Sequence, residues 1–232
     1  MAAIPDDQTL TEKGFDAAPD TGADTRPDMA PEAERLLVIA CGALAREIIA
    51  VRDSSGLSHI DLTCLPAILH NHPDQITGAV EDAVLKHKDS YARIFVAYAD
   101  CGTGGQLRAA CDRLGVQMID GPHCYAFYEG LTQFPERDDA TSFYLTDFLV
   151  RQFDAFVWKP LGLDRYPELR DMYFGNYRSL VYQAQTDDPE LDVRARICAD
   201  RLGLRYERRL TGYGDLGTAL RDWAVVRSLK TV

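Results

Sequence analysis

The stretch Leu36-Leu37-Val38-Ile39-Ala40 is a continuous apolar run, and Cys41-Gly42 follows it directly. A short run without alternating polar residues is typical of a β-strand that is buried on both faces of a parallel sheet. Apolar residues then recur at spacings of four and three, which predicts an amphipathic helix over 43–52. The stretch therefore predicts a strand, a tight turn and a helix, which is the first unit of an α/β fold.

The same order of strand and helix continues along the chain. Strands that alternate with helices of about 10 to 15 residues indicate a parallel sheet with right-handed crossovers. We therefore expect a Rossmann-like α/β fold, an open parallel sheet of about six strands with helices on both faces. The remaining predicted elements are strands at 60–65, 94–99, 116–119, 179–185 and 204–210, and helices at 74–87, 105–114, 143–156, 167–177, 189–202 and 215–225.

The first 33 residues differ in composition from the rest. They are rich in Asp, Pro, Ala, Gly and Thr and carry few large apolar side chains. Such a segment buries too little surface to offset its ordering entropy, so a disordered tail is predicted for 1–33. Residues 34–232 are predicted to form a single α/β domain. The alternative is a pair of pseudo-halves, 34–135 and 136–232.

Charge and hydropathy exclude some classes of partner. The 232 residues include 36 acidic and 25 basic side chains, a formal net charge of −11, and this field repels nucleic acid and anionic lipid. No apolar run approaches the roughly 18 residues of a membrane span, and a signal-peptide pattern is absent, so we expect a cytoplasmic protein. In a reducing compartment the six cysteines are expected to be free thiols that are buried, metal-binding or reactive.

Side chains that can bind metal follow each of the first four predicted strands. Ligands of open α/β sheets bind beyond the carboxyl ends of the strands, where loops converge. Three thiolates with one imidazole suit Zn²⁺, the first choice of cofactor, and three thiolates alone suit an iron–sulfur cluster, the second choice. Any one cysteine taken alone is more often a packing residue. The candidate metal ligands are Cys41, Cys101 and Cys124, with His70 or His123 as a fourth.

The segment Asp100-Cys101-Gly102-Thr103-Gly104-Gly105 lies between a predicted strand and a predicted helix. Its glycines let the backbone approach an anion, and the helix dipole attracts negative charge. It matches neither the GxGxxG nor the Walker pattern, so no nucleotide is predicted. The helix start would favour a Cys101 thiolate, whereas Asp100 would oppose it. The candidate cofactor-binding residues are Gly42, Gly102, Thr103, Gly104 and Gly105, and the candidate catalytic residues are Asp100 and Glu47.

Six motifs carry a resemblance to a known family. They are CGALAREI at 41–48, LPAILHNHP at 65–73, YADCGTGG at 98–105, GPHCYAFYEG at 121–130, FYLTDFL at 143–149 and GYGDL at 212–216. With them the sequence resembles the family called domain of unknown function 1638. The resemblance implies that Cys41, Cys101 and Cys124 belong to three cysteine motifs and His70 to a Leu-His-Asn motif.

Members of that family are often associated with corrinoid-dependent methyl transfer, so the resemblance implies a role in one-carbon metabolism. The sequence has no Asp-x-His-x-x-Gly corrinoid signature, and any cobalamin would therefore be held by a partner, such as a corrinoid or methyltransferase protein. The substrate class would be a small-molecule thiol or an anion.

Three functions remain open from the sequence. The first is a metal-dependent transferase or its accessory factor, in which zinc activates a substrate thiol. The second is a non-catalytic cofactor carrier or chaperone module. The third is a metal-free cysteine-dependent enzyme, with Cys101 as nucleophile and His123 as base.

Overall fold

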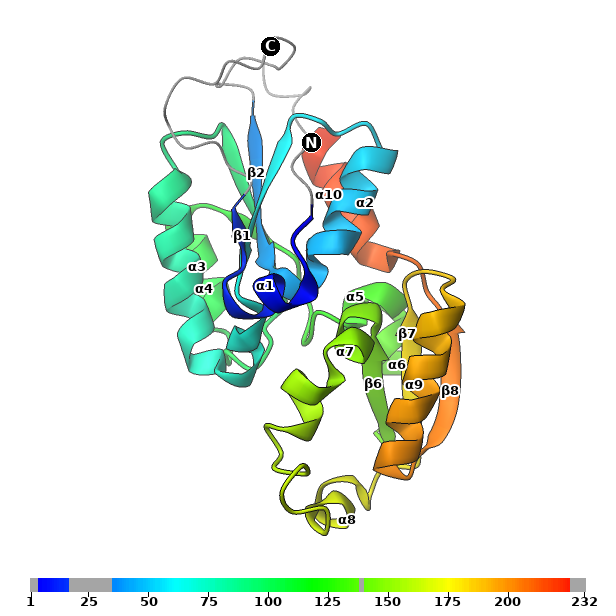
Figure 1. The fold of residues 1–232 in the computed structure, drawn as a ribbon. Helices are drawn as coiled ribbons and strands as arrows, with labels where there is room; N and C mark the ends of the chain where they lie inside the picture. The colour runs from blue at the N-terminus through cyan, green and yellow to red at the C-terminus, as the bar shows by residue number, and fades with distance from the viewer. Residues whose placement is uncertain (1–3, 17–34, 138–139, 226–232) are drawn as a thin grey trace. The chain divides into compact units, whose positions relative to one another are not determined.

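The computed structural model describes residues 4–16, 35–137 and 140–225. They fall into two compact units. Unit 1 contains the described residues up to Cys124 and those from Leu216 onward, and unit 2 contains Tyr125–Asp215. Unit 2 is thus an insertion in the sequence of unit 1, as the colours in Figure 1 show. The chain passes between the units after Cys124 and after Asp215, and not at the boundary at 135 that separates the two predicted halves.

The core of unit 1 is a five-stranded sheet. Its strands are β1 (Phe15–Asp16), β2 (Leu36–Cys41), β3 (Ile60–Leu65), β4 (Arg93–Ala97) and β5 (Gln117–Met118). They lie in the order β1-β3-β2-β4-β5, with β2 to β5 parallel and β1 antiparallel to β3. Every residue of β2 is buried, as its continuous apolar sequence predicts.

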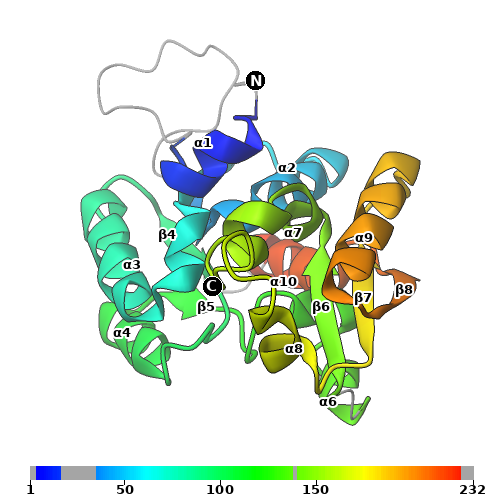
Figure 2. The same ribbon diagram turned by 60° about the horizontal axis from the view of Figure 1, so that its bottom comes forward.

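Helices cover both faces of this sheet. They are α2 (Ala45–Ser54), α3 (Pro73–His87), α4 (Gln106–Leu114) and α10 (Gly214–Val225), with short 3₁₀ turns at η2 (Gly42–Leu44) and η3 (Ala67–Asn71). In Figures 1 and 2, α3 and α4 lie on one side and α2 and α10 on the other. Trp223 of α10 stacks on Phe95 of β4, with ring centroids 5.0 Å apart. The mixed α/β class with helices on both faces is therefore confirmed.

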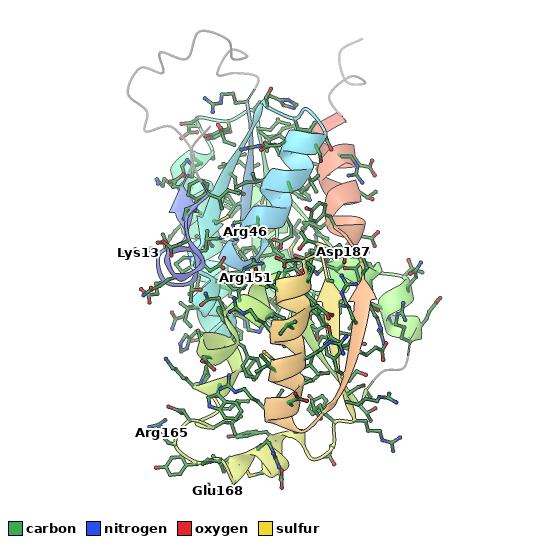
Figure 3. The ribbon with its side chains drawn as sticks, turned by 45° about the vertical axis from the view of Figure 1, so that its right-hand side comes forward. Lys13, Arg46, Arg151, Arg165, Glu168 and Asp187 are labelled. Atoms are coloured by element: carbon green, nitrogen blue, oxygen red, sulfur yellow. The ribbon has the colours of Figure 1, made fainter. Side chains whose placement is uncertain are left out.

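Residues 4–16, part of the predicted disordered tail, are structured. They form α1 (Asp7–Glu12) and β1, and the Asp6 side chain caps α1 by accepting a hydrogen bond from the Thr9 amide. Leu10 is fully buried. Arg46 of α2, labelled in Figure 3, lies 3.0 Å from Asp7. The prediction of disorder is wrong for these residues, because composition averaged over 33 residues hides one capped helical turn; residues 1–3 and 17–34 lie outside the described residues.

Unit 2 contains a separate three-stranded parallel sheet in the order β6-β7-β8. Its strands are β6 (Ser142–Thr146), β7 (Ser179–Ala184) and β8 (Arg205–Leu210). Its helices are α5 (Ala126–Glu129), α6 (Gln133–Glu136), α7 (Asp147–Arg151), α8 (Leu169–Phe174) and α9 (Pro189–Leu202), with a π-helical turn, η4 (Asp154–Trp158). The predicted single sheet of about six strands is therefore wrong, since the parallel strands belong to two sheets.

One predicted helix is also wrong. The range 143–156 begins as β6, and α7 starts only at Asp147. The change occurs at Thr146, whose extended backbone ends the strand and whose hydroxyl accepts a hydrogen bond from the Leu149 amide.

Among the described residues, no helix has both the length and the apolar character needed to cross a membrane.

Candidate functional site

Two of the three predicted cysteine ligands meet beyond the carboxyl ends of β4 and β5. The Cys101 and Cys124 Sγ atoms are 3.1 Å apart. The backbone explains this proximity, because hydrogen bonding between the two segments continues past the strands. The amide of Asp100 donates to the carbonyl of Gly121, and the amide of Cys101 donates to that of Pro122, each at 2.9 Å.

The backbone of Cys101 has an unusual conformation. Its φ of +48° makes it the one non-glycine residue with positive φ in the described part of the chain. Such a conformation is sterically costly for a residue with a Cβ atom and persists only where surrounding structure imposes it. Gly102 follows with φ +85°, and a Cβ atom there would lie 3.3 Å from Pro73 at the start of α3. The loop therefore fixes the position of the Cys101 thiol.

The two thiols differ in their affinity for a proton. A hydrogen bond from the Cys124 side chain lowers the pKa of Cys101 below its ordinary value, although burial opposes this effect. The same interaction, with burial, raises the pKa of Cys124 well above its ordinary value. Cys101 is therefore the sulfur that becomes a thiolate, and Cys124 is the thiol that donates to it.

Cys41 approaches this pair from the end of β2. Burial, together with the negative charge of Cys101, raises the pKa of its thiol to about 12, and the effect of Cys101 places the two sulfurs within electrostatic range. Cys64 is also buried, and burial and the nearby Cys41 raise the pKa of its thiol. Cys111 and Cys198 are buried as well.

Tyr98 is a residue of this cluster that the sequence analysis did not identify. Its side chain is 2% exposed, and burial, followed by the proximity of the Cys41 and Cys124 sulfurs, raises the pKa of its hydroxyl well above the usual range. The Tyr98 hydroxyl lowers the pKa of the Cys41 thiol. Within the described ranges, this hydroxyl makes no hydrogen bond of ordinary geometry. The sequence did not indicate this role, because a tyrosine within the apolar run 94–99 is expected to be a residue of the hydrophobic core.

The sulfurs as they lie do not fit a metal ion. Across residues 4–16, 35–137 and 140–225, no three His, Cys, Asp or Glu side chains form a group that could hold one. Two thiolates on one tetrahedral zinc would lie about 3.7 Å apart, since each Zn–S bond is about 2.3 Å. The 3.1 Å between Cys101 and Cys124 is shorter and suits a contact between a thiol and a thiolate.

The two predicted histidines lie near each other on exposed positions. Protein atoms around the rings still disfavour the charged forms. Partial burial and the neighbouring His123 lower the pKa of His70, and partial burial also lowers the pKa of His123, although Asp100 opposes this. Both imidazoles are therefore neutral at pH 7 and able to accept a proton.

The Asp100 carboxylate accepts hydrogen bonds from backbone amides of the loop that was predicted to bind a cofactor. It accepts hydrogen bonds from the amide of Gly105 at 2.6 Å, the amide of Gly104 at 3.1 Å and the hydroxyl of Thr103 at 2.9 Å. The Gly105 bond is the largest cause of a lowered Asp100 pKa. The anion bound by this loop is therefore its own Asp100 carboxylate, and these hydrogen bonds stabilise the start of α4.

Gly42 and Glu47 lie near Cys41 but differ from their predicted roles. A Cβ atom on Gly42 would be 2.4 Å from the carbonyl oxygen of Leu10, so glycine is needed there for α1 to pack against η2. Glu47 of α2 is 4% exposed, and its charge raises the pKa values of Cys41 and Cys64. It lies beside buried thiols rather than at the exposed pair.

Unit 2 contains a buried carboxylate in the FYLTDFL motif. Asp147 is 1% exposed and accepts hydrogen bonds from the hydroxyls of Tyr182 at 2.7 Å and Thr186 at 2.6 Å. The amide of Gln185 donates to the same carboxylate at 3.0 Å. Both carboxylate oxygens accept hydrogen bonds from residues on β7 or just after it, so Asp147 has a structural role.

A comparison with protein families agrees with the motif resemblance. The model of a family described as protein of unknown function (DUF1638) matches residues 64–220. The matched range includes Cys101 and Cys124 and begins after Cys41. No curated protein and no solved structure matches the chain. Because the match covers more than half of the 232 residues, the chain belongs to the DUF1638 family.

Proposed function

We propose that the protein is a cysteine-dependent enzyme whose nucleophile is the Cys101 thiolate and whose chemistry needs no metal. The observation that carries this proposal is the 3.1 Å contact between the Cys101 and Cys124 sulfurs. A thiolate that accepts a hydrogen bond is stabilised as the charged form, which is the reactive form of cysteine. The reaction class is attack of this sulfur on a small electrophile.

The surroundings of Cys101 support this assignment. The left-handed backbone holds the thiol at the end of β4, and Cys101 retains partial exposure to solvent. The neutral imidazole of His123, next to Cys124 in sequence, is the candidate base for the Cys124 proton. The proposal places the protein in a reducing compartment such as the cytoplasm, where both thiols stay reduced.

Alkylation kinetics test the proposal. Iodoacetamide is expected to modify Cys101 first at neutral pH, and Cys101→Ser is expected to remove the fast phase. Cys124→Ala removes the hydrogen-bond donor, so the midpoint of the pH–rate profile should move to higher pH. Cys111→Ser is the matched control, because Cys111 is 1% exposed and should leave the profile unchanged. A fast phase that survives in Cys101→Ser would contradict the proposal.

Metal binding is the second candidate function, and the position of Cys41 favours it. A third thiol lies within electrostatic range of the Cys101–Cys124 pair, and a metal ion can displace protons from thiols that burial keeps neutral. Cys41, Cys101 and Cys124 would hold zinc or an iron–sulfur cluster only after the sulfurs of Cys101 and Cys124 move apart. Elemental analysis and an absorption spectrum of anaerobically purified protein test this candidate, and about zero equivalents of metal would remove it. The carrier function stays a prediction.

A further inference from the structure

We infer that Cys101 and Cys124 form a reversible disulfide, and that the site takes small molecules containing a sulfur–sulfur bond as substrates. This inference rests on the proposed function, because Cys101 must first act as a nucleophile. It goes further by giving Cys124 a chemical role and by naming the bond that is attacked.

Solvent access separates this pair from the other cysteines. Cys41, Cys64, Cys111 and Cys198 are buried, whereas Cys101 and Cys124 are both partly exposed. These two partly exposed cysteines are also the two whose sulfur atoms are in contact. A small molecule can therefore reach the pair, while the remaining thiols are protected by the core.

Little movement separates the dithiol from the disulfide. A sulfur–sulfur bond is about 2.05 Å long, so the Sγ atoms at 3.1 Å must approach by about 1 Å. The backbones of the two segments are already joined by the hydrogen bond from the Cys101 amide to the Pro122 carbonyl. Rotation of the side chains can then supply the approach while the ends of β4 and β5 keep their positions.

Disulfide exchange at the Cys101–Cys124 pair takes two steps. The Cys101 thiolate attacks one sulfur of a disulfide R–S–S–R, forming a mixed disulfide with Cys101 and releasing RS⁻. Cys124 then loses its proton and attacks the Cys101 sulfur, which releases the second RS⁻. The protein loses two electrons and gains one disulfide, and the small molecule is reduced to two thiol groups. The Cys124 proton passes to a released thiolate, with His123 as the candidate carrier.

Oxidised glutathione is a suitable probe for the full chain. Reduced wild-type protein is expected to form an internal Cys101–Cys124 disulfide, identified by peptide mapping, and to release both glutathione halves. Cys124→Ser should stop at the first step and retain one glutathionyl group on Cys101. Cys101→Ser should not react on this timescale, and Cys198→Ser should behave as wild type.

The outcomes separate this inference from the proposed function. If Cys101 is alkylated rapidly but the wild type keeps a glutathionyl group or forms a disulfide with Cys41, the inference fails and the proposed function stands. If Cys101→Ser reacts with both iodoacetamide and oxidised glutathione as fast as wild type, both fail. Circular dichroism of each variant excludes misfolding as the cause of a lost reaction.

Discussion

Gln183 is buried in a way that its polarity does not explain. Its side chain is 0% exposed, and both amide atoms lack a hydrogen-bond partner within the described residues. It lies on β7, with Thr146 and Arg209 in register on the neighbouring strands. Leaving a buried amide unsatisfied costs about 1–3 kcal/mol. An apolar side chain of similar length should therefore be tolerated better than glutamine.

We accordingly expect Gln183→Met to raise the free energy of unfolding by about 1 kcal/mol, measured by urea titration. Gln185→Met is the matched control. Gln185 accepts a hydrogen bond from the Asp147 amide and donates one to the Gln183 carbonyl, each at 2.7 Å, so its replacement should lower the free energy by about 1–3 kcal/mol. A similar loss in both variants would mean that the Gln183 amide has a partner.

At the scale of residues, the sequence predicted that Cys101 and Cys124 meet but not how their side chains interact. Cys101 and Cys124 were found because the carboxyl ends of parallel strands share one edge of a sheet. The 3.1 Å contact between their sulfurs depends on positions of a few tenths of an ångström, which no spacing encodes. Asp100 was assigned to catalysis because nothing in the order of residues shows that its carboxylate folds back onto Gly104 and Gly105.

Among the elements, α9 and β8 are joined by a partly exposed carboxylate that makes stability depend on pH. Asp192 of α9 accepts a hydrogen bond from the Tyr206 hydroxyl at 2.6 Å, and this bond is the largest cause of a lowered Asp192 pKa. A carboxylate with a lowered folded-state pKa contributes stability above its unfolded value near 3.8, and this contribution is lost as pH falls through the folded value.

Asp192→Asn is therefore expected to lower the free energy of unfolding by about 1–2 kcal/mol at pH 7. The difference from wild type should shrink as the pH falls below about 3.8, since the wild-type carboxylate then becomes neutral. Urea unfolding at a series of pH values measures both effects. Asp200→Asn, an exposed position on the same helix, should change stability by less than about 0.5 kcal/mol. A pH-independent difference would contradict the assignment.

Elements with strong local signals were predicted well, and short elements were not. Helix α9 has the predicted bounds, because the Asp188 side chain caps its start and Gly203, with φ +71°, ends it. The range 143–156 failed because a five-residue strand is followed at once by a five-residue helix, and neither is long enough to show its own period.

For the whole molecule, the N-terminal segment is part of the core of unit 1. Leu10 is fully buried, and Gly14, with φ +74°, packs against the carbonyl of Cys64. Leu10→Ala is expected to lower the free energy of unfolding by about 2–4 kcal/mol. Gln8→Ala, an exposed position on the same helix, should have an effect of less than about 0.5 kcal/mol in the same urea titration. Equal stability of both variants would show that α1 does not pack in solution.

The overall division of the chain could not be predicted from local patterns. Strands of both sheets, such as β2 and β7, are buried along their whole length, and which strands pair depends on contacts between distant residues. The sequence also gives no sign that α10 adds to unit 1 rather than to the strands that precede it. The α/β class and the meeting of Cys101 and Cys124 at the strand ends follow from local order, whereas the presence of two sheets does not.

The hydrogen bonds that continue the β4–β5 pairing have a practical consequence for spectroscopy. The amide hydrogens of Asp100 and Cys101 lie in a loop, yet both are held by carbonyls of the opposite segment. Their exchange with deuterated solvent should be slow compared with that of ordinary loop amides. In ¹⁵N-labelled protein these two amide resonances would report on the loop that contains Cys101 without chemical modification of its thiol.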